Sequence, residues 1–363
     1  MKLLTVILSL LILSVVINSG CGDSGTVNSQ ALLTPTVSID LIKECDLTVD
    51  PLADSALISD DPNAFIYIED IIRNMPHVKE VVAKKDAMVV EYDWGGVDVW
   101  LDQPTPPPDA SLRISSSAFL SEDKSDLLKA VGNKKAIIIN VIAADPGFTG
   151  DLGNLNNIET YLKNKGFSVT RSNDATNSVE SFKKLSDYGV IIYNGHGGLE
   201  DMTSGSYYGI QSGELYDSEN ISDERKEDME NKRVEEFTVN WGTGSTKGQK
   251  SFWGITNKYL TAYTSGYDNS FFYNMACEGM KKPKKENVLP PMGLTLSGLG
   301  NGIYFGWTES VSQSCDTGEV FIKGMCDGKT AGTVYKSQKW TDASPTAELK
   351  YYPVNSTAED ITF

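Results

Sequence analysis

Histidine is scarce in this chain of 363 residues, which contains only His77 and His196. Neither an HExxH nor a CxxC pattern occurs, so the ligand spacing of the common zinc sites is missing. Chemistry that needs an imidazole base therefore has almost no choice of residue. His77 lies between a predicted helix and a predicted hairpin, where we expect an ordinary surface-loop histidine.

Basic charge is also in short supply. Lysine and arginine number 32 against 49 acidic residues, and the net charge is −17. Nucleic acid is therefore excluded as a partner, because phosphate binding needs a basic face. The acidity leaves room for a structural Ca²⁺, but no loop has convincing ligand spacing. We expect no cofactor and no metal in the chemistry.

A long hydrophobic run occurs at the N-terminus, where the apolar stretch 3–17 follows Lys2. It is too short for a membrane span and predicts an export signal. Cys21 comes next, before a tether rich in glycine, serine and asparagine, and the pattern resembles a bacterial lipoprotein signal. Asn18 departs from it, because a leucine-like residue is usual there. We expect lipidation of Cys21 and a membrane-anchored protein of the cell envelope that faces the periplasm or the exterior; the alternative is a secreted protein.

Four cysteines remain after Cys21: Cys45, Cys277, Cys315 and Cys326. Export permits disulfides. If Cys277 stays free, three are left, and an odd number cannot all pair. Nearness in sequence favours a bridge between Cys315 and Cys326, and the alternative is that these cysteines are buried free thiols.

Changes in composition along the chain predict six segments. They are a signal peptide at 1–20, a tether at 21–50, a small α/β domain at 51–102, a Pro/Ser-rich linker at 103–117, a large α/β domain at 118–345 with an excursion at 199–250, and a tail at 346–363. Within the excursion, 214–236 is strongly acidic and predicts a solvated helix or flap.

Strands and helices alternate from Lys134 onward, as in a parallel sheet with right-handed crossovers. Two predicted strands end in groups that carry chemistry. The run 190–194 leads into His196, and the run 271–276 leads into Cys277. Because ligands collect at the carboxyl ends of parallel strands, we expect both side chains at one sheet edge.

A cysteine activated by a histidine is a nucleophile for acyl transfer. The tetrahedral intermediate also needs two donors for its oxyanion. The backbone N–H groups of Gly197 and Cys277 fit those roles. The alternatives are a small buried cysteine and a histidine in a turn.

The segments YNGHGG and MACEG resemble the His-Gly and Ala-Cys regions of the caspase-like clan of cysteine peptidases, nearest to the gingipain-type bacterial family. The second segment is one residue shorter than the Ala-Cys-x-x-Gly of that family. The following LTLSGLGNGIYFGWTESV is similar to the strand and loop after the nucleophile. The resemblance covers about 134–340. It implies a mostly parallel sheet sandwiched by helices, a His196–Cys277 dyad, and Trp307 in the specificity pocket.

Gingipains bind Arg or Lys through an acid in the loop after the first strand, and here Asp145 and Asp151 both occupy that loop. The alternative for these residues is turn and helix-cap chemistry. Clostripain-like members place the acid two residues before the nucleophile, where this chain has Met275. Glu278 follows the nucleophile, as in legumain, and we expect it to point away or to tune the thiol.

These features together predict an exported cysteine endopeptidase that acts on proteins or peptides, with a preference for Arg or Lys before the cut. One alternative is a non-catalytic scaffold of the same fold that binds peptides or partners. The other is a surface adhesin built on the 51–102 domain.

Overall fold

The structure is a computed structural model of the chain. It describes residues 37–59, 61–102, 129–142, 152–173, 176–241, 248–284, 289–311, 314–342, 346–353 and 359–363. Within these residues it confirms the mixed α/β class that the sequence predicted. No helix in the described ranges is both long and apolar enough to cross a membrane.

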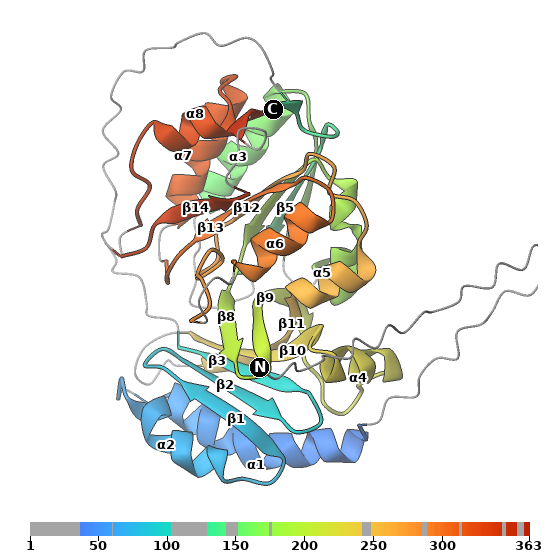
Figure 1. Ribbon diagram of the computed structural model, residues 1–363, viewed down its shortest axis with the longest axis vertical. Helices are drawn as coiled ribbons and strands as arrows, with labels where there is room; N and C mark the ends of the chain where they lie inside the picture. Colours follow the sequence, from blue (N-terminus) through green and yellow to red (C-terminus); the bar gives the residue numbers. More distant parts are fainter. Residues whose placement is uncertain are drawn as a thin grey trace, which may run out of the picture. The chain divides into compact units, whose positions relative to one another are not determined.

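A six-stranded sheet forms the centre of the larger part of the fold (Figure 1). In order across the sheet, its strands are β14 (Leu349–Tyr352), β13 (Ile303–Trp307), β12 (Phe271–Asn274), β7 (Val190–Asn194), β5 (Lys135–Asn140) and β6 (Ser168–Asn173). Neighbouring strands are parallel except for β14, which pairs antiparallel with β13. The inner strands are continuous apolar runs because both faces of the sheet are covered.

Helices cover each face of this sheet (Figure 1). One face packs against α3 (Leu152–Asn164), α7 (Ser314–Cys326) and α8 (Ala331–Lys336). The other packs against the 3₁₀ helix η3 (Val179–Asp187), α5 (Asn257–Tyr263) and α6 (Pro291–Gly298). The apolar positions Leu155, Ile158 and Leu162 repeat every three or four residues, which places them on the buried face of α3.

A seven-stranded sheet forms the second layer. In order, its strands are β1 (Val78–Ala83), β2 (Ala87–Tyr92), β3 (Val97–Leu101), β10 (Val234–Trp241), β11 (Gly248–Thr256), β9 (Gly205–Leu215) and β8 (Gly197–Met202). All neighbours are antiparallel except β3 and β10, which are parallel. The strands of the predicted 51–102 domain and of the 199–250 excursion therefore belong to one sheet. A small parallel pair joins β4 (Lys129–Ala130) to β15 (Ile361–Thr362).

The tether predicted for 21–50 is wrong from Ile39 onward. There α1 (Ile39–Leu57) begins, with Ser38 as its N-cap, and it is followed by α2 (Ala64–Arg73). Both helices pack on one face of β1, β2 and β3, below these strands in Figure 1. The Gly/Ser/Asn-rich start of the segment suggested a tether, whereas the apolar positions Val49, Ala53 and Leu57 of α1 belong to a core that the strands complete.

The solvated helix or flap predicted for 214–236 is confirmed in part, since a helix was one of the two alternatives, and it is wrong at its end, where the chain enters a sheet. A short helix, α4 (Asp223–Glu230), follows Ser222 as its N-cap, and β10 begins at Val234. The acids that suggested a solvated segment include Glu235 and Glu236, which are both buried in the sheet. Their burial depends on strands far away in the sequence, so local charge does not reveal it.

Candidate functional site

The strands β7 and β12 are adjacent and parallel, and they deliver the two predicted catalytic side chains to one edge of the sheet. In their register Tyr193 pairs with Asn274. His196 and Cys277 each come three residues after those partners, just beyond the carboxyl ends of the two strands. The structure thus brings the predicted pair to the same edge.

His196 lies in the two-residue connection between β7 of the central sheet and β8 of the second sheet. It is 3% exposed. Its carbonyl oxygen accepts hydrogen bonds from the Tyr193 hydroxyl at 3.0 Å and the Gln211 N–H at 3.1 Å. These bonds fix the backbone at the point where the chain passes between the two sheets.

The glycines on either side of His196 are there because tyrosine hydroxyls fill the space. A Cβ at Gly195 would lie 2.2 Å from the Tyr193 hydroxyl oxygen, and a Cβ at Gly197 would lie 2.4 Å from that of Tyr208. The Gly-His-Gly pattern is therefore a packing requirement as well as a motif. Gly197, the predicted oxyanion donor, is buried at the first position of β8.

Cys277 is partly exposed, and its backbone is held by a polar network under the strand ends. Its carbonyl oxygen accepts a hydrogen bond from the Tyr208 hydroxyl at 2.6 Å. The Asn274 amide donates to the hydroxyl oxygens of Tyr208 at 2.9 Å and Tyr304 at 2.7 Å. Three strands, β9, β12 and β13, thus fix the turn that carries the thiol.

The loop after β13 covers the sulfur. The Val311 N–H donates a hydrogen bond to Cys277 Sγ at 3.3 Å. Burial raises the pKa of the Cys277 thiol to about 11, although this N–H opposes the shift. The thiol is therefore protonated at neutral pH in this arrangement.

Glu278 is buried beside the thiol, in the left-handed backbone region with φ of 57°. Its carboxylate accepts a hydrogen bond from the Leu199 N–H at 3.2 Å and pairs with Lys84 at 3.6 Å and with Lys281. Burial alone would raise the pKa of Glu278, but Lys84 and Lys281 bring it below its usual range. The negative charge in turn contributes to the raised pKa of the Cys277 thiol, as the tuning role predicted.

Lys84 comes from the turn between β1 and β2, which sequence reasoning did not connect with the site. The neighbouring Asp86 accepts a hydrogen bond from the Ser310 hydroxyl at 3.5 Å, in the loop that covers the sulfur. The N-terminal strands therefore contact both sides of the Cys277 segment. No sequence signal pointed to this contact, because it depends on the sheet pairing of β3 with β10.

Cys315 is a second residue that sequence reasoning missed at this edge. Its Sγ donates to Asn194 Oδ1 at 3.1 Å, from the first turn of α7. The disulfide predicted between Cys315 and Cys326 is wrong, since the two cysteines are not bonded to each other. They lie near opposite ends of α7, roughly 16 Å apart along the helix axis, whereas a disulfide needs Cα atoms within about 7 Å. Cys45 is also free and is buried.

Of the predicted substrate-binding residues, the structure describes only Trp307, and its side chain does not reach the surface. Trp307 is at the end of β13, beside β12, but it is 0% exposed and belongs to the core between the sheet and α7. Asp145 and Asp151 lie outside the described residues, as does the predicted lipidation residue Cys21.

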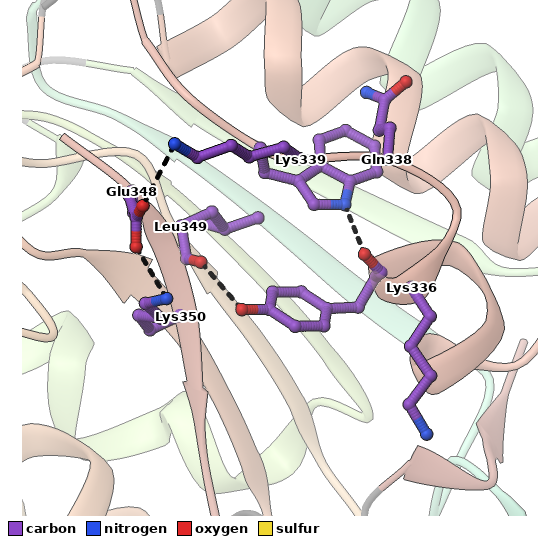
Figure 2. A pocket seen from close by; sticks show the side chains of 8 residues that line it. Lys336, Gln338, Lys339, Glu348, Leu349 and Lys350 are labelled. Atoms are coloured by element: carbon purple, nitrogen blue, oxygen red, sulfur yellow. Dashed lines mark hydrogen bonds and ion pairs between the residues drawn. The ribbon is translucent and has the colours of Figure 1, made fainter. Parts of the chain in front are cut away.

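A cavity of about 310 Å³ occurs in a different part of the fold, between α8 and β14 (Figure 2). Its lining includes Lys339 and Lys350, which both pair with Glu348, and Trp340, whose indole N–H donates to the Tyr335 carbonyl. None of these residues was a predicted site residue, and the two lysines are held by the carboxylate between them.

A third feature is a group of acids between α1 and the second sheet. Carboxylate oxygens of Asp46, Asp50 and Glu236 all lie within 4.8 Å of one another. Oxygen atoms in this arrangement are suitable ligands for a hard divalent cation.

No protein-family model matches the chain, and no curated protein sequence matches it. Among solved structures, the chain is similar to the Drosophila initiator caspase Dronc, with 10% sequence identity and a TM-score of 0.30. The match covers 65% of this chain and 87% of that one.

Proposed function

We propose that the protein is a cysteine endopeptidase in which His196 and Cys277 form the catalytic dyad. The observation that supports the proposal is the register of β7 and β12, since the histidine and the thiol each come three residues after a paired residue of these two adjacent parallel strands. They are the strand ends at which α/β proteins place their chemistry.

In this proposal Cys277 Sγ attacks the scissile carbonyl carbon, and its proton passes to His196. His196 then gives the proton to the leaving amine, and water hydrolyses the thioester. The thiol is protonated before substrate arrives, since burial raises its pKa to about 11. The loop at Val311 must also move away from the sulfur, because the Val311 N–H donates a hydrogen bond to Cys277 Sγ and covers one side of it.

The substrates that we propose are proteins or peptides, with Arg or Lys before the cut as the preferred residue and Asp145 or Asp151 as the acid that selects it. We also propose that the chain is a member of the gingipain-type family and has its caspase-like fold, as the catalytic segments suggest. The mostly parallel order of the central sheet, with helices on both faces, supports this.

The test is hydrolysis of a fluorogenic peptide library by the wild type and three variants. Cys277→Ala and His196→Ala should each lower turnover by about 10³-fold or more, because members of a catalytic unit fail together. Cys326→Ala is the matched control, a partly exposed thiol at the far end of α7, and should stay within about twofold of wild type. Wild-type turnover in Cys277→Ala would contradict the proposal. The residues found before each cut in the wild-type digest show whether Arg or Lys is preferred.

A second candidate is a scaffold that binds peptides without cutting them, favoured by the closed state of the thiol under Val311. An electrophilic peptide probe separates the two. Covalent labelling of Cys277 that is lost in His196→Ala supports the peptidase. Tight peptide binding with neither labelling nor hydrolysis supports the scaffold.

A further inference from the structure

The face of α1 that lies against the second sheet carries a row of acids. Asp46, Asp50 and Asp54 are spaced by four residues, so they share one side of the helix. A helix face turned toward a sheet is normally apolar. Like charges four residues apart also destabilise a helix. The row therefore needs an explanation other than packing.

The strands opposite contribute two more acids. Asp98 on β3 and Glu236 on β10 are direct partners in the parallel pairing of these strands. They are 1% and 3% exposed. Like charges on neighbouring strands also repel. Five carboxylates from three elements thus gather in one buried layer.

Hydrogen bonds satisfy some of these groups. Asp98 accepts from the Tyr92 hydroxyl at 2.6 Å, and Asp46 accepts from the Tyr216 hydroxyl at 3.3 Å. Asp54 accepts from the indole N–H of Trp100 at 3.2 Å.

Two oxygens remain without a hydrogen-bond partner in the described part of the chain. They are Oδ1 of Asp50 and Oε2 of Glu236. Glu236 is almost fully buried, and its carboxylate lies in the group with those of Asp46 and Asp50. A buried carboxylate oxygen with no donor is costly, and a cation would supply its missing partner.

A neighbouring acid in the same sheet shows how this fold handles a buried carboxylate when a lysine is at hand. Glu91 on β2 pairs with Lys232 at 2.6 Å and with Lys79 at 2.7 Å. Among the described residues, no lysine or arginine forms such an ion pair with the five acids near α1. The five acids therefore lie close together without a protein cation between them.

We propose that Asp46, Asp50 and Glu236 bind one hard divalent cation of the Ca²⁺ type, which ties α1 to β10. The ligand atoms are all carboxylate oxygens, the donors that Ca²⁺ prefers over softer metals. Ca²⁺ takes six to eight oxygens, and water together with the second oxygens of these carboxylates completes the set. The site is structural and lies apart from the His196–Cys277 dyad, so it does not depend on the proposed peptidase activity.

The test compares thermal unfolding and metal binding of the full chain after treatment with EDTA. Adding Ca²⁺ should raise the Tm of the wild type by about 5 °C at saturation, and equilibrium dialysis should find one bound ion per chain. Asp50→Asn and Glu236→Gln should abolish both responses, because each loses a charged ligand. Glu44→Gln is the matched control, an exposed acid on the outer side of the same helix, and should keep them. Mg²⁺, Mn²⁺ and Zn²⁺ are added in parallel to establish the preferred ion.

Two results would overturn the inference. One is a wild-type Tm that no divalent cation changes. In that case the acids would be held by shared protons alone. Asp50→Asn and Glu236→Gln should then raise the Tm of the metal-free protein, because a neutral amide removes the repulsion between neighbouring carboxylates. The other is a Ca²⁺ response of equal size in wild type and both variants, which would place the ion elsewhere. Because binding by the wild type is measured directly, a variant that fails to fold does not leave the question open.

Discussion

Cys277 and Glu278 are neighbours in the sequence, yet their surroundings shift their pKa values in opposite directions. Burial raises the pKa of the Cys277 thiol, whereas Lys84 and Lys281 outweigh burial and lower the pKa of Glu278. A neutral thiol beside an ionised carboxylate is a poor nucleophile, which keeps the residue inert until its surroundings change.

The raised thiol pKa gives a prediction for alkylation. Only the thiolate reacts, so the rate of Cys277 modification by iodoacetamide should rise about tenfold per pH unit between pH 7 and pH 9, and it should continue to rise toward the pKa of about 11. Peptide mapping by mass spectrometry assigns the label, with Cys277→Ala as the blank. A rate that is already level above pH 7 would show a preformed ion pair with His196 and contradict this prediction.

At the scale of elements, the junction of α4 and β10 depends on one lysine. Lys232 adopts a φ of 54° between the helix and the strand, and its ammonium group bonds to Glu91 on β2 and to the Ser204 hydroxyl at 2.5 Å. Glu91 has a fully buried side chain, and its other lysine partner, Lys79, is half exposed. The pair therefore joins β2 to the start of β10 where the two halves of the second sheet meet.

Replacing this lysine should be costly. Lys232→Met leaves the buried carboxylate of Glu91 with the half-exposed Lys79 as its one ion-pair partner beside the Ser204 hydroxyl, and we expect a loss of about 2–4 kcal/mol in the free energy of unfolding. Lys226→Met is the control, because Lys226 on α4 pairs with the exposed Asp223 and should lose less than about 1 kcal/mol. Urea unfolding followed by circular dichroism measures both. Equal losses in the two variants would refute the special role of Lys232.

At the scale of the whole molecule, the described residues form one compact unit, Pro35–Phe363, in which two sheets meet at the candidate site. The chain passes from β7 to β8 through Gly195 and His196 and so links the sheets directly. The N-terminal strands reach the same place through Lys84. A shift of the β1–β2 turn in the second sheet therefore alters the contacts of Glu278, the residue next to Cys277.

The N-terminal sequence predicts how the protein is anchored to the cell envelope. We propose that Cys21 is lipidated and anchors the protein to the cell envelope, because it follows an export-type apolar run and precedes a tether. Mass spectrometry of the mature N-terminal peptide should find an acylated cysteine, and Cys21→Ala should release the protein from the membrane fraction. An unmodified N-terminus in wild type, or full release of wild type into the medium, would contradict the prediction.

The sequence by itself determined the central strands and the two residues at their ends. Runs such as 190–194 and 271–274 are buried on both faces of the sheet, so their apolar character is continuous and local. His196 and Cys277 follow those runs closely, so their places beyond the strand ends could be predicted from the sequence. The turn after a strand is a local feature, and local features can be identified from sequence.

Only the tertiary structure decided which distant segments meet. The pairing of β3 with β10 joined the strands of a predicted separate domain and of the predicted 199–250 excursion into one sheet. It also placed Glu236 against Asp50 and brought Lys84 to Glu278. Charge alone favours a solvated segment for these acids, and their burial follows from pairings between residues far apart in the chain. Helix geometry likewise separated Cys315 from Cys326, which nearness in sequence had suggested as a disulfide, because eleven residues of α-helix span far more than a disulfide can bridge.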